Sequence, residues 1–448
     1  MDYDPGTILE DRRGSIRVGS ECGIKCGADS VSGSVSQRAC VYCGARVVLN
    51  PITDAFHIVH GPIGCASYTW DIRGSLTSDD ERYRNSYSTD MTEKNIIFGG
   101  EKKLEAAIDE IITEHSPKLI FVYSTCIAGV IGDDIGAVCR RSEKKYPGTR
   151  MIPVQAPGFS GNKAHGYRLA CEAIMNVIRP YGGQPKVKAV NFLGDYNLAG
   201  EAWIVRAYLE RIGIPVLTTM TGDSCHDSLI KAPAASMNIV QCAGSMTYLA
   251  KCMEEEFGIP YMKISFFGVE DTSASILRIA EAVGNEDNIR LAKELIASEE
   301  SRVLPVLEQY KKGLKGKKAA VYVGGGFKAI SLIRQFNSLG MKTVMVGTQT
   351  GTQEEYEIIR RLADEDTVVL DDANPSELEK FMKDKGADIL VGGVKERPLA
   401  YKLNVAFCDH NHERRHALAG YDGAVNFTKE IHSSICSPVW GYVRGGRK

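Results

Sequence analysis

Short apolar runs that alternate with amphipathic stretches are the feature that most constrains the fold of this chain. Runs such as Leu119–Tyr123, Lys188–Leu193 and Ala319–Val323 have the length and apolar content of buried strands. Longer segments with apolar residues at helical spacing, such as 201–212, follow them. Because alternating strands and helices form parallel sheets with right-handed crossovers, the pattern predicts an α/β protein with mainly parallel sheets.

We expect three such α/β domains around a central metal-cluster cleft. Their predicted bounds are residues 38–186, 187–315 and 316–448, and a polar arm rich in Gly and Ser, residues 1–37, precedes them. The charged stretch from Glu286 to Lys315 is interpreted as a solvated helix that joins the second domain to the third. With 448 residues, 44% of them hydrophobic, the chain can form several cores.

Charge and cysteine content narrow the class of protein. The formal net charge is −2, so nothing favours binding to nucleic acid or to an anionic membrane. No apolar stretch approaches the length that spans a bilayer, and the first residues do not resemble a signal peptide. The 13 cysteines are scattered over the whole length rather than packed in a short secreted framework. We therefore expect a soluble cytoplasmic protein.

Three cysteines, Cys40, Cys65 and Cys126, occur in three segments that are expected to be loops. Cys65 follows Gly61 and Pro62, which predict a tight turn. Cys126 follows a predicted strand, at the carboxyl edge where open α/β sheets place ligand-binding groups. Thiolates are the preferred ligands of iron–sulfur clusters, four to an ordinary cluster. Three from one chain leave the set incomplete, and a partner subunit could complete it.

Plain packing is the alternative for each of these cysteines, because free cysteine is among the most buried residue types. The separations match no compact ferredoxin or zinc pattern, so spacing alone leaves both interpretations open. Cys22 and Cys26 are either inert or a loose extra metal-binding pair, with the inert interpretation favoured, and the role of Cys43 stays open.

Two further segments carry candidate binding residues. Cys242 follows a predicted strand and precedes a predicted helix, whose N-terminus would favour a thiolate, although packing is again the alternative. Gly325, Gly326 and Lys328 follow the strand 319–323, and glycines let a backbone approach an anion. The segment lacks the spacing of dinucleotide or ATP motifs, which disfavours those enzymes. Another bulky anion and a simple turn are both compatible with it.

The densest polar segment, residues 407–416, contains His410, His412 and His416. Imidazole is a common metal ligand, but a solvated charged loop is the favoured interpretation. The turn Ala419–Gly423 is a better site candidate, because its glycines and aspartate specify a turn that leads into a helix. No nucleophile elbow and no acid/base pair of carboxylates stand out, so conventional hydrolases receive little support.

Taken together, these segments resemble the nitrogenase component 1 family over nearly all of Cys40 to Trp440. The motifs that carry the resemblance are Cys40-Val41-Tyr42, His60-Gly61-Pro62-Ile63-Gly64-Cys65, Phe98-Gly99-Gly100-Glu101-Lys102-Lys103-Leu104, Tyr123-Ser124-Thr125-Cys126, Gly194-Asp195-Tyr196-Asn197 and Ala419-Gly420-Tyr421-Asp422-Gly423. The resemblance implies three Rossmann-like domains per subunit and a homologous second subunit, paired as an α2β2 heterotetramer.

The resemblance also implies roles for individual residues. Cys40, Cys65 and Cys126 match the ligands of an iron–sulfur cluster at the subunit interface. Cys242 matches the cysteine that holds one end of the large iron–molybdenum cofactor. Arg73 and Lys328 resemble the basic residues that surround this cofactor, and the glycines before Lys328 would lie against it.

Two departures distinguish this chain from the family's catalytic subunit. Ala419 stands where that subunit has the histidine that holds the cofactor's other end, and alanine cannot ligate a metal. Tyr167 stands where it has a histidine near the reactive face, which removes a candidate proton donor. The resemblance therefore implies an assembly scaffold rather than a turnover enzyme, although a histidine of the 407–416 segment could substitute as a ligand.

Such a scaffold would hold an iron–sulfur–carbide precursor during insertion of molybdenum and homocitrate. It would contact a precursor donor, the iron protein and cofactor-free nitrogenase transiently. One alternative is the catalytic α-subunit of a nitrogenase or nitrogenase-like reductase that works with an ATP-dependent iron protein. The other is a cluster-free structural subunit, against which the three cysteines argue.

Overall fold

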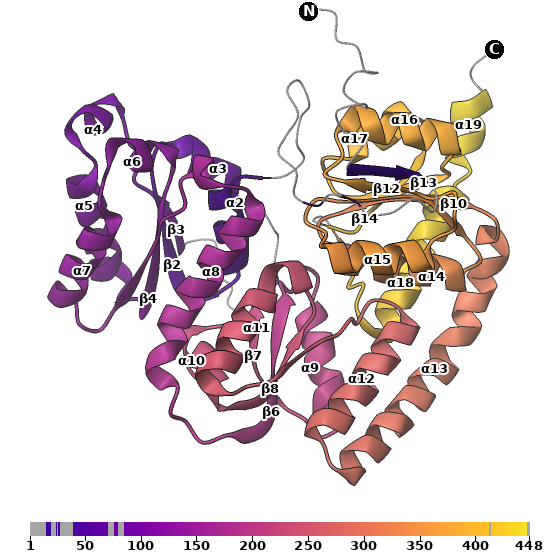
Figure 1. Cartoon of the computed structure of the whole chain (residues 1–448), viewed down its shortest axis with the longest axis horizontal. Coiled ribbons are helices and arrows are strands. Elements are labelled where there is room, and N and C mark those ends of the chain that lie inside the picture. The colour runs from indigo at the N-terminus through magenta and orange to yellow at the C-terminus, as the bar shows by residue number, and fades with distance from the viewer. Residues whose placement is uncertain are drawn as a thin grey trace, which may run out of the picture. The chain divides into compact units, whose positions relative to one another are not determined.

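Three β-sheets with flanking helices make up the protein (Figure 1). A computed structural model describes residues 15–18, 24, 26, 39–69, 76–78, 85–411 and 414–445. The chain divides into two compact units. Residues 39–263 contain two of the sheets, and residues 264–448 together with the N-terminal segment contain the third. The prediction of an α/β fold with mainly parallel sheets is confirmed.

The first sheet is parallel throughout, with strand order β3-β2-β4-β5. Its elements are α2 Val41–Leu49, β2 Ala55–His60, α3 Ile63–Thr69, β3 Ser86–Ser88, α4 Glu93–Phe98, α5 Glu101–His115, β4 Leu119–Ser124, α6 Cys126–Ile131, α7 Ile135–Lys145, β5 Arg150–Val154 and α8 Lys163–Ile178. Both faces are covered, so successive side chains of β4 enter different cores. Ile120 and Val122 pack in the core with α5 and α7, whereas Phe121 and Tyr123 pack in the core with α2 and α8.

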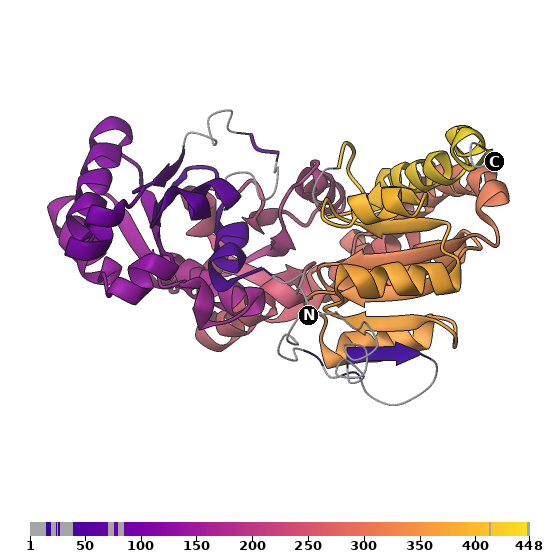
Figure 2. The same ribbon diagram turned by 90° about the horizontal axis from the view of Figure 1, so that it is seen from above.

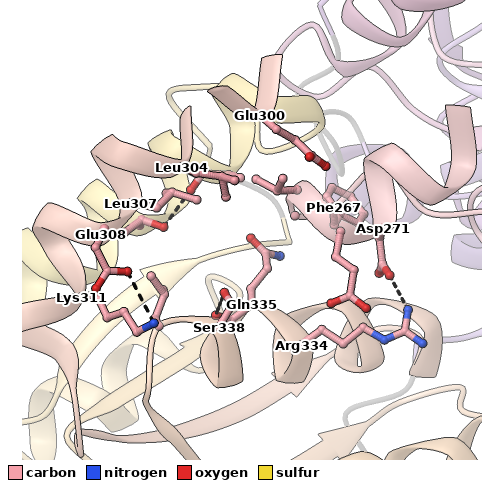
Figure 3. A pocket seen from close by; sticks show the side chains of 16 residues that line it. Phe267, Asp271, Glu300, Leu304, Leu307, Glu308, Lys311, Arg334, Gln335 and Ser338 are labelled. Atoms are coloured by element: carbon pink, nitrogen blue, oxygen red, sulfur yellow. Dashed lines mark hydrogen bonds and ion pairs between the residues drawn. The ribbon is translucent and has the colours of Figure 1, made fainter. Parts of the chain in front are cut away.

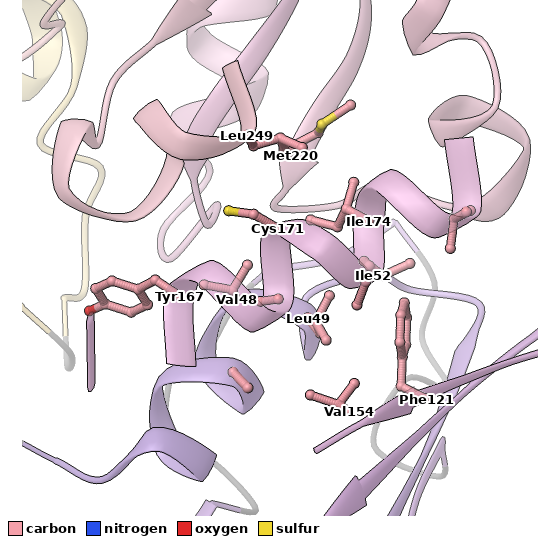
Figure 4. Packing of buried hydrophobic residues seen from close by; sticks show 14 of the residues in the cluster. Val48, Leu49, Ile52, Phe121, Val154, Tyr167, Cys171, Ile174, Met220 and Leu249 are labelled. Carbon is pink, nitrogen blue, oxygen red and sulfur yellow. The ribbon is translucent and has the colours of Figure 1, made fainter. Parts of the chain in front are cut away.

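The second sheet is also parallel, with strand order β7-β6-β8-β9. Its elements are β6 Val187–Asp195, α9 Glu201–Arg211, β7 Val216–Thr221, α10 His226–Leu229, β8 Ala235–Val240, α11 Ala243–Phe257 and β9 Tyr261–Lys263. Leu249 of α11 and Met220 of β7 belong to the same hydrophobic core as Ile174 of α8 and Leu49 of α2 (Figure 4). This shared core explains why residues 39–263 form one unit. The domain boundary placed between residues 186 and 187 remains a prediction.

The third sheet has strand order β1-β12-β11-β10-β13-β14. Its elements are β1 Ile16–Val18, α12 Val269–Val283, α13 Glu286–Leu314, β10 Lys318–Val323, α14 Gly326–Ser338, β11 Lys342–Thr348, α15 Gln353–Leu362, β12 Val368–Asp371, α16 Pro375–Lys385, β13 Ile389–Gly392, α17 Arg397–Lys402, β14 Ala406–Asp409, α18 Gly420–Ile435 and α19 Val439–Gly445. Figure 2 shows β1 at the sheet edge, antiparallel to β12. The N-terminal arm thus contributes a strand that its polar composition did not indicate.

The charged stretch predicted as a helix is confirmed as α13, a single helix of 29 residues. It is not solvated all round, because Ala292, Leu295 and Val303 form a buried stripe at helical spacing. This stripe packs α13 against α12 and α18. Within the described residues, no helix combines the length and apolar character needed to cross a membrane.

Helix α2 crosses α8 at two glycines. A Cβ atom at Gly166 of α8 would lie 2.1 Å from the carbonyl oxygen of Val41, and one at Gly44 of α2 would lie 2.2 Å from that of Lys163. Neither distance is compatible with a side chain, so the two backbones are in direct contact. The crossing fixes the N-terminus of α2 beside the segment that precedes α8.

Replacement of Gly166 by alanine tests this contact. Gly166→Ala is expected to lower the free energy of unfolding by about 1–3 kcal/mol, because the new methyl group must push α2 away. The matched control is Gly148→Ala, where nothing lies within 4 Å and the change should stay within about 0.5 kcal/mol. Denaturant unfolding of both variants makes the comparison, and equal stabilities would contradict a close crossing.

Candidate metal centre

Three neighbouring strands of the first sheet end at the same edge, where the candidate site lies. Strands β2, β4 and β5 are parallel and adjacent, so their carboxyl ends lie side by side. The segments that follow them carry Cys65, Cys126 and Gly158. Cys40 comes from a different direction, because it is the N-cap of α2 and forms a β-bridge with Asn162.

The thiols of Cys40 and Cys126 meet at Gly158. The Gly158 amide donates a hydrogen bond to Cys126 Sγ at 3.2 Å. A Cβ atom at Gly158 would lie 3.0 Å from Cys126 Sγ and 3.4 Å from Cys40 Sγ, so glycine is what leaves both thiols in place. Burial raises the pKa of the Cys65 thiol, and the neighbouring Cys126 and Cys40 raise it further. The structure therefore brings together the three cysteines that the sequence analysis selected.

Cys65 lies in the first turn of helix α3, whereas the sequence analysis expected a turn around it. Gly61 and Pro62 form the bend, and the helix begins directly after them. Proline fits there because its fixed φ is compatible with a helix start and the missing N–H would have no helical partner. A Cβ atom at Gly61 would lie 2.0 Å from Thr125 Oγ1. Thr125 in turn donates to the His60 carbonyl oxygen, which ties the Cys65 and Cys126 segments together.

The three thiols are not placed to share a single metal ion. Cys40 is exposed and the other two are half-buried, so the group opens to the surface. Among the described residues, no three His, Cys, Asp or Glu side chains gather closely enough to hold one metal ion. One tetrahedral ion with metal–sulfur bonds of about 2.3 Å holds its thiolates about 3.8 Å apart. A cluster of several irons binds thiolates at more widely spaced corners and would leave its last corner to another ligand.

A buried histidine–aspartate pair supports this edge. His60 Nε2 lies 2.9 Å from Asp133 Oδ2, and His60 Nδ1 lies 3.1 Å from Thr89 Oγ1. Asp133 also accepts a hydrogen bond from the Gly100 amide. Burial lowers the pKa of His60, and the interaction with Asp133 opposes this only in part. Neither this pair nor Gly158 could be predicted from the sequence, because contacts between distant segments leave no periodic signal.

Cys242 occupies the N-cap of α11 and is half-buried. The end of β6 packs directly against it, since a Cβ atom at Gly194 would lie 2.6 Å from the Cys242 amide nitrogen. Gly194 also has a φ of +84°, a region that favours glycine. This explains the glycine of the Gly194-Asp195-Tyr196-Asn197 motif and leaves the Cys242 thiol at the carboxyl edge of the second sheet.

The glycine-rich segment begins α14, with Gly325 as its N-cap. The Phe327 amide donates to Glu355 Oε1 at 2.9 Å, and a Cβ atom at Gly326 would lie 2.6 Å from Glu355 Cβ. Glu355 therefore occupies part of the helix N-terminus that the sequence analysis offered to an anionic ligand. Lys328 Nζ donates to the His410 carbonyl oxygen at 3.3 Å and lies 5.7 Å from the centroid of a phenylalanine ring.

The polar segment 407–416 is not simply a solvated loop. His410 is fully buried, and its ring is in edge contact with Phe267 and Phe427. Neither ring nitrogen of His410 has a hydrogen-bond partner within the described part of the chain. His416 is exposed. Ala419 is the buried N-cap of α18 and forms a β-bridge with Phe267.

Three other residues that were singled out from the sequence have defined positions in the structure, and three more lie outside the described residues. Tyr167 is a core residue of α8, with Lys163 Nζ 5.9 Å from its ring centroid. Cys43 is buried inside α2, and Cys26 Sγ lies 3.6 Å from the side-chain oxygen of Gln353. The positions that lie outside the described residues are Cys22, Arg73 and His412.

His410 generates a pH-dependent prediction for the cluster-free chain. Burial and the nearby Lys328 and Arg414 hold the pKa of His410 well below its usual value, so only the unfolded chain takes up this proton as pH falls below about 6.5. The free energy of unfolding is therefore expected to fall as the pH is lowered below about 6.5. His410→Leu should be neutral or up to about 1 kcal/mol more stable at pH 7 and should lose less stability at pH 5. Denaturant unfolding measures both effects.

His416→Leu is the control for this substitution, because His416 is exposed and the variant should keep the parent pH profile. A loss of several kcal/mol at pH 7 in His410→Leu would mean that the imidazole makes an essential interaction, and it would refute the prediction.

Comparisons with known proteins identify the family of the chain. The family model "Nitrogenase component 1 type Oxidoreductase" matches residues 40–436. The chain is 63% identical to the nitrogenase iron-molybdenum cofactor biosynthesis protein NifE of Clostridium pasteurianum, over 99% of this chain and 100% of that protein. It is 49% identical to NifE of Methanosarcina barkeri, over 97% of each chain.

Among solved structures, "Nitrogenase Cp1 at pH 6.5" superimposes with a TM-score of 0.90. It is 28% identical to this chain, and the superposition covers 99% of this chain and 98% of that one. Both the sequence and the fold therefore match over nearly the full length. This chain belongs to the nitrogenase component 1 type oxidoreductase family.

Proposed function

We propose that this chain is the NifE-type subunit of a cytoplasmic scaffold on which the iron–molybdenum cofactor of nitrogenase is assembled. The observation that carries the proposal is the group of three thiols at one open sheet edge. The names of the relatives support an assembly role. Alanine at position 419, where the catalytic subunit would need a histidine, supports it independently.

In this proposal Cys40, Cys65 and Cys126 hold an iron–sulfur cluster with a fourth ligand from outside the chain. Such a cluster supplies one-electron transfer when bound. The chain contributes thiolates and one backbone donor, because the Gly158 amide already points at Cys126 Sγ. A hydrogen bond to a thiolate stabilises its negative charge and is one of the factors that set a cluster's potential.

The outside ligand would come from a homologous NifN-like subunit in an α2β2 heterotetramer. Large apolar side chains with more than half of their surface exposed lie on the segments that carry the cysteines or pack against them: Ile63, Ile97, Phe98, Val130 and Phe159. They belong to α3, α4, α6 and the segment after Gly158, and α4 packs on α6. Figure 1 shows these helices at one end of the first sheet. Exposed apolar groups around an incomplete ligand set favour a protein partner on this face.

Introducing a charged side chain into this apolar face tests whether a partner subunit binds there. Phe98 is 81% exposed, so Phe98→Asp should leave the stability of the isolated chain nearly unchanged. Burying the new carboxylate at an interface should weaken partner association by about tenfold or more. Tyr442→Asp is the matched control, because Tyr442 is 83% exposed on α19. Co-purification and analytical ultracentrifugation compare the variants, and equal association would argue against this face.

The cargo would be the iron–sulfur–carbide precursor, which leaves after molybdenum and homocitrate have been added. We propose Cys242 as its protein ligand and Lys328 as a cation that offsets its negative charge. Gly325 and Gly326 would offer backbone contacts, and Arg73 would add a second cation. A single thiolate ligand suits a cargo that must be released. A NifB-like donor, the iron protein and cofactor-free nitrogenase would be transient partners.

The catalytic α-subunit is the competing function, and two positions speak against it. Ala419 has no ligating atom, and Tyr167 is a buried phenol packed in the core of α8 rather than an imidazole. Anaerobic metal analysis and EPR of the chain with its partner, followed by substrate reduction with the iron protein, distinguish the functions. A large transferable cluster without turnover supports the scaffold. Turnover would assign the chain to the reductases.

Cys242→Ala tests the proposed cargo ligand. The variant should fold normally, because the thiol is only half-buried at a helix N-cap, and it should retain less precursor iron while the three-thiol site keeps its own. Cys252→Ala is the control, since Cys252 is a half-buried cysteine of the same helix. Iron and EPR quantification after maturation measures retention. Unchanged precursor content in Cys242→Ala would remove this residue from the proposal.

A further inference from the structure

A cavity of about 510 Å³ lies between α12, α13, α14 and α18, within the unit formed by residues 264–448 (Figure 3). Its volume is in the range of small-molecule sites. No residue of the proposed cluster or cargo sites lines it. The apolar part of the lining consists mainly of Phe267, Leu304, Leu307, Leu339 and Ala424.

Gln335 places an amide in this largely apolar cavity. The residue is 8% exposed and lines the cavity, and its contact with Ser338 Oγ is made by its backbone carbonyl oxygen, so that among the described residues the side-chain amide makes no hydrogen bond. Figure 3 shows this amide directed into the cavity. Gly268 makes room for it, because a Cβ atom there would lie 2.7 Å from Gln335 Cγ. The amide can therefore donate and accept hydrogen bonds to a ligand in the cavity, which would orient that ligand.

The charges around the cavity have a negative surplus. The lining contains the four carboxylates of Glu270, Asp271, Glu300 and Glu308, against the two cations of Lys311 and Arg334. Both cations are already paired. Arg334 binds Asp271, and Lys311 Nζ lies 3.5 Å from Glu308 Oε2.

The two carboxylates that remain are Glu270 and Glu300. Glu300 accepts a hydrogen bond from Ser273 Oγ at 2.6 Å, which orients it without neutralising it. Glu270 is exposed at the N-terminus of α12. The cavity therefore repels anions and attracts cations.

We infer that this cavity binds a small organic cation with an aliphatic body, such as a primary amine or a guanidine. The ammonium group would meet Glu300 and Glu270, the aliphatic chain would cover the leucines, and a second polar group would pair with the Gln335 amide. A purely apolar ligand would leave that amide unpaired. A bare metal ion lacks a ligand set, because no suitable trio exists among the described residues. The inference does not rest on the proposed scaffold function.

The probe is 5-aminopentan-1-ol, which carries an ammonium group, five methylenes and a hydroxyl. Calorimetric titration of the full chain should give saturable binding with a Kd of about 1 mM, as expected for so few atoms. Pentane-1,5-diol, the uncharged analogue, should bind at least about tenfold more weakly. Binding of the amine should also weaken as salt is raised.

Two variants locate the binding. Glu300→Gln removes the charge but keeps an acceptor for Ser273, and it should weaken amine binding about three- to tenfold without changing diol binding. Leu304→Trp fills the cavity from a side chain that is 48% exposed, so it should abolish binding without overpacking a core. Val439→Trp is the matched control, at 50% exposure outside the cavity.

Each outcome decides the inference. It is supported if the amine binds more tightly than the diol, Glu300→Gln weakens the amine selectively, and Leu304→Trp abolishes binding while Val439→Trp does not. It is overturned if the amine shows no saturable binding up to about 20 mM, if amine and diol bind equally, or if a folded Leu304→Trp chain binds as well as the parent.

Discussion

The glycine contact between α2 and α8 is the constraint on which the candidate metal centre depends. At this crossing the two helices touch backbone to backbone, with Gly44 against Lys163 and Gly166 against Val41. Cys40 is the residue before α2, and its bridge to Asn162 lies directly before α8. A side chain at either glycine would separate the helices and move Cys40 away from Gly158, where the Cys126 thiol is bound. The close helix crossing that Gly44 and Gly166 allow therefore determines the position of the Cys40 thiol.

The sequence predicted the parts of this centre that follow from regular structure. Parallel strands place their carboxyl ends at one edge, so the positions of Cys65 and Cys126 after β2 and β4 could be inferred from apolar runs alone. Gly158 and Cys40 could not, because their place depends on a loop and on a helix crossing. The sequence also did not indicate that a helix begins just before Cys65, because Gly61 and Pro62 predict a turn that extends through this residue.

Residue polarity misled the prediction in the unit that contains the third sheet. A segment with three histidines and two arginines indicates a solvated loop, yet His410 is buried between two aromatic rings. Gln335 is buried in the same unit, and its amide lines a cavity. Whether a polar side chain is buried depends on which elements pack over it, and a single sequence does not report that. Helix α13 was predicted to be solvated because of its many charged residues, yet it has a buried apolar stripe.

Residue 419, which we propose as a difference between a scaffold and a catalytic subunit, lies in a closely packed part of the fold. Ala419 is fully buried, it bridges to Phe267, and the next amide donates to the Phe266 carbonyl oxygen at 2.7 Å. Because Ala419 is fully buried, an imidazole at this position would need additional space. Overpacking of this kind costs about 1–3 kcal/mol or forces the backbone to move. A histidine at this place would therefore require the start of α18 to be repacked, which agrees with the proposal that cargo is held by one thiolate.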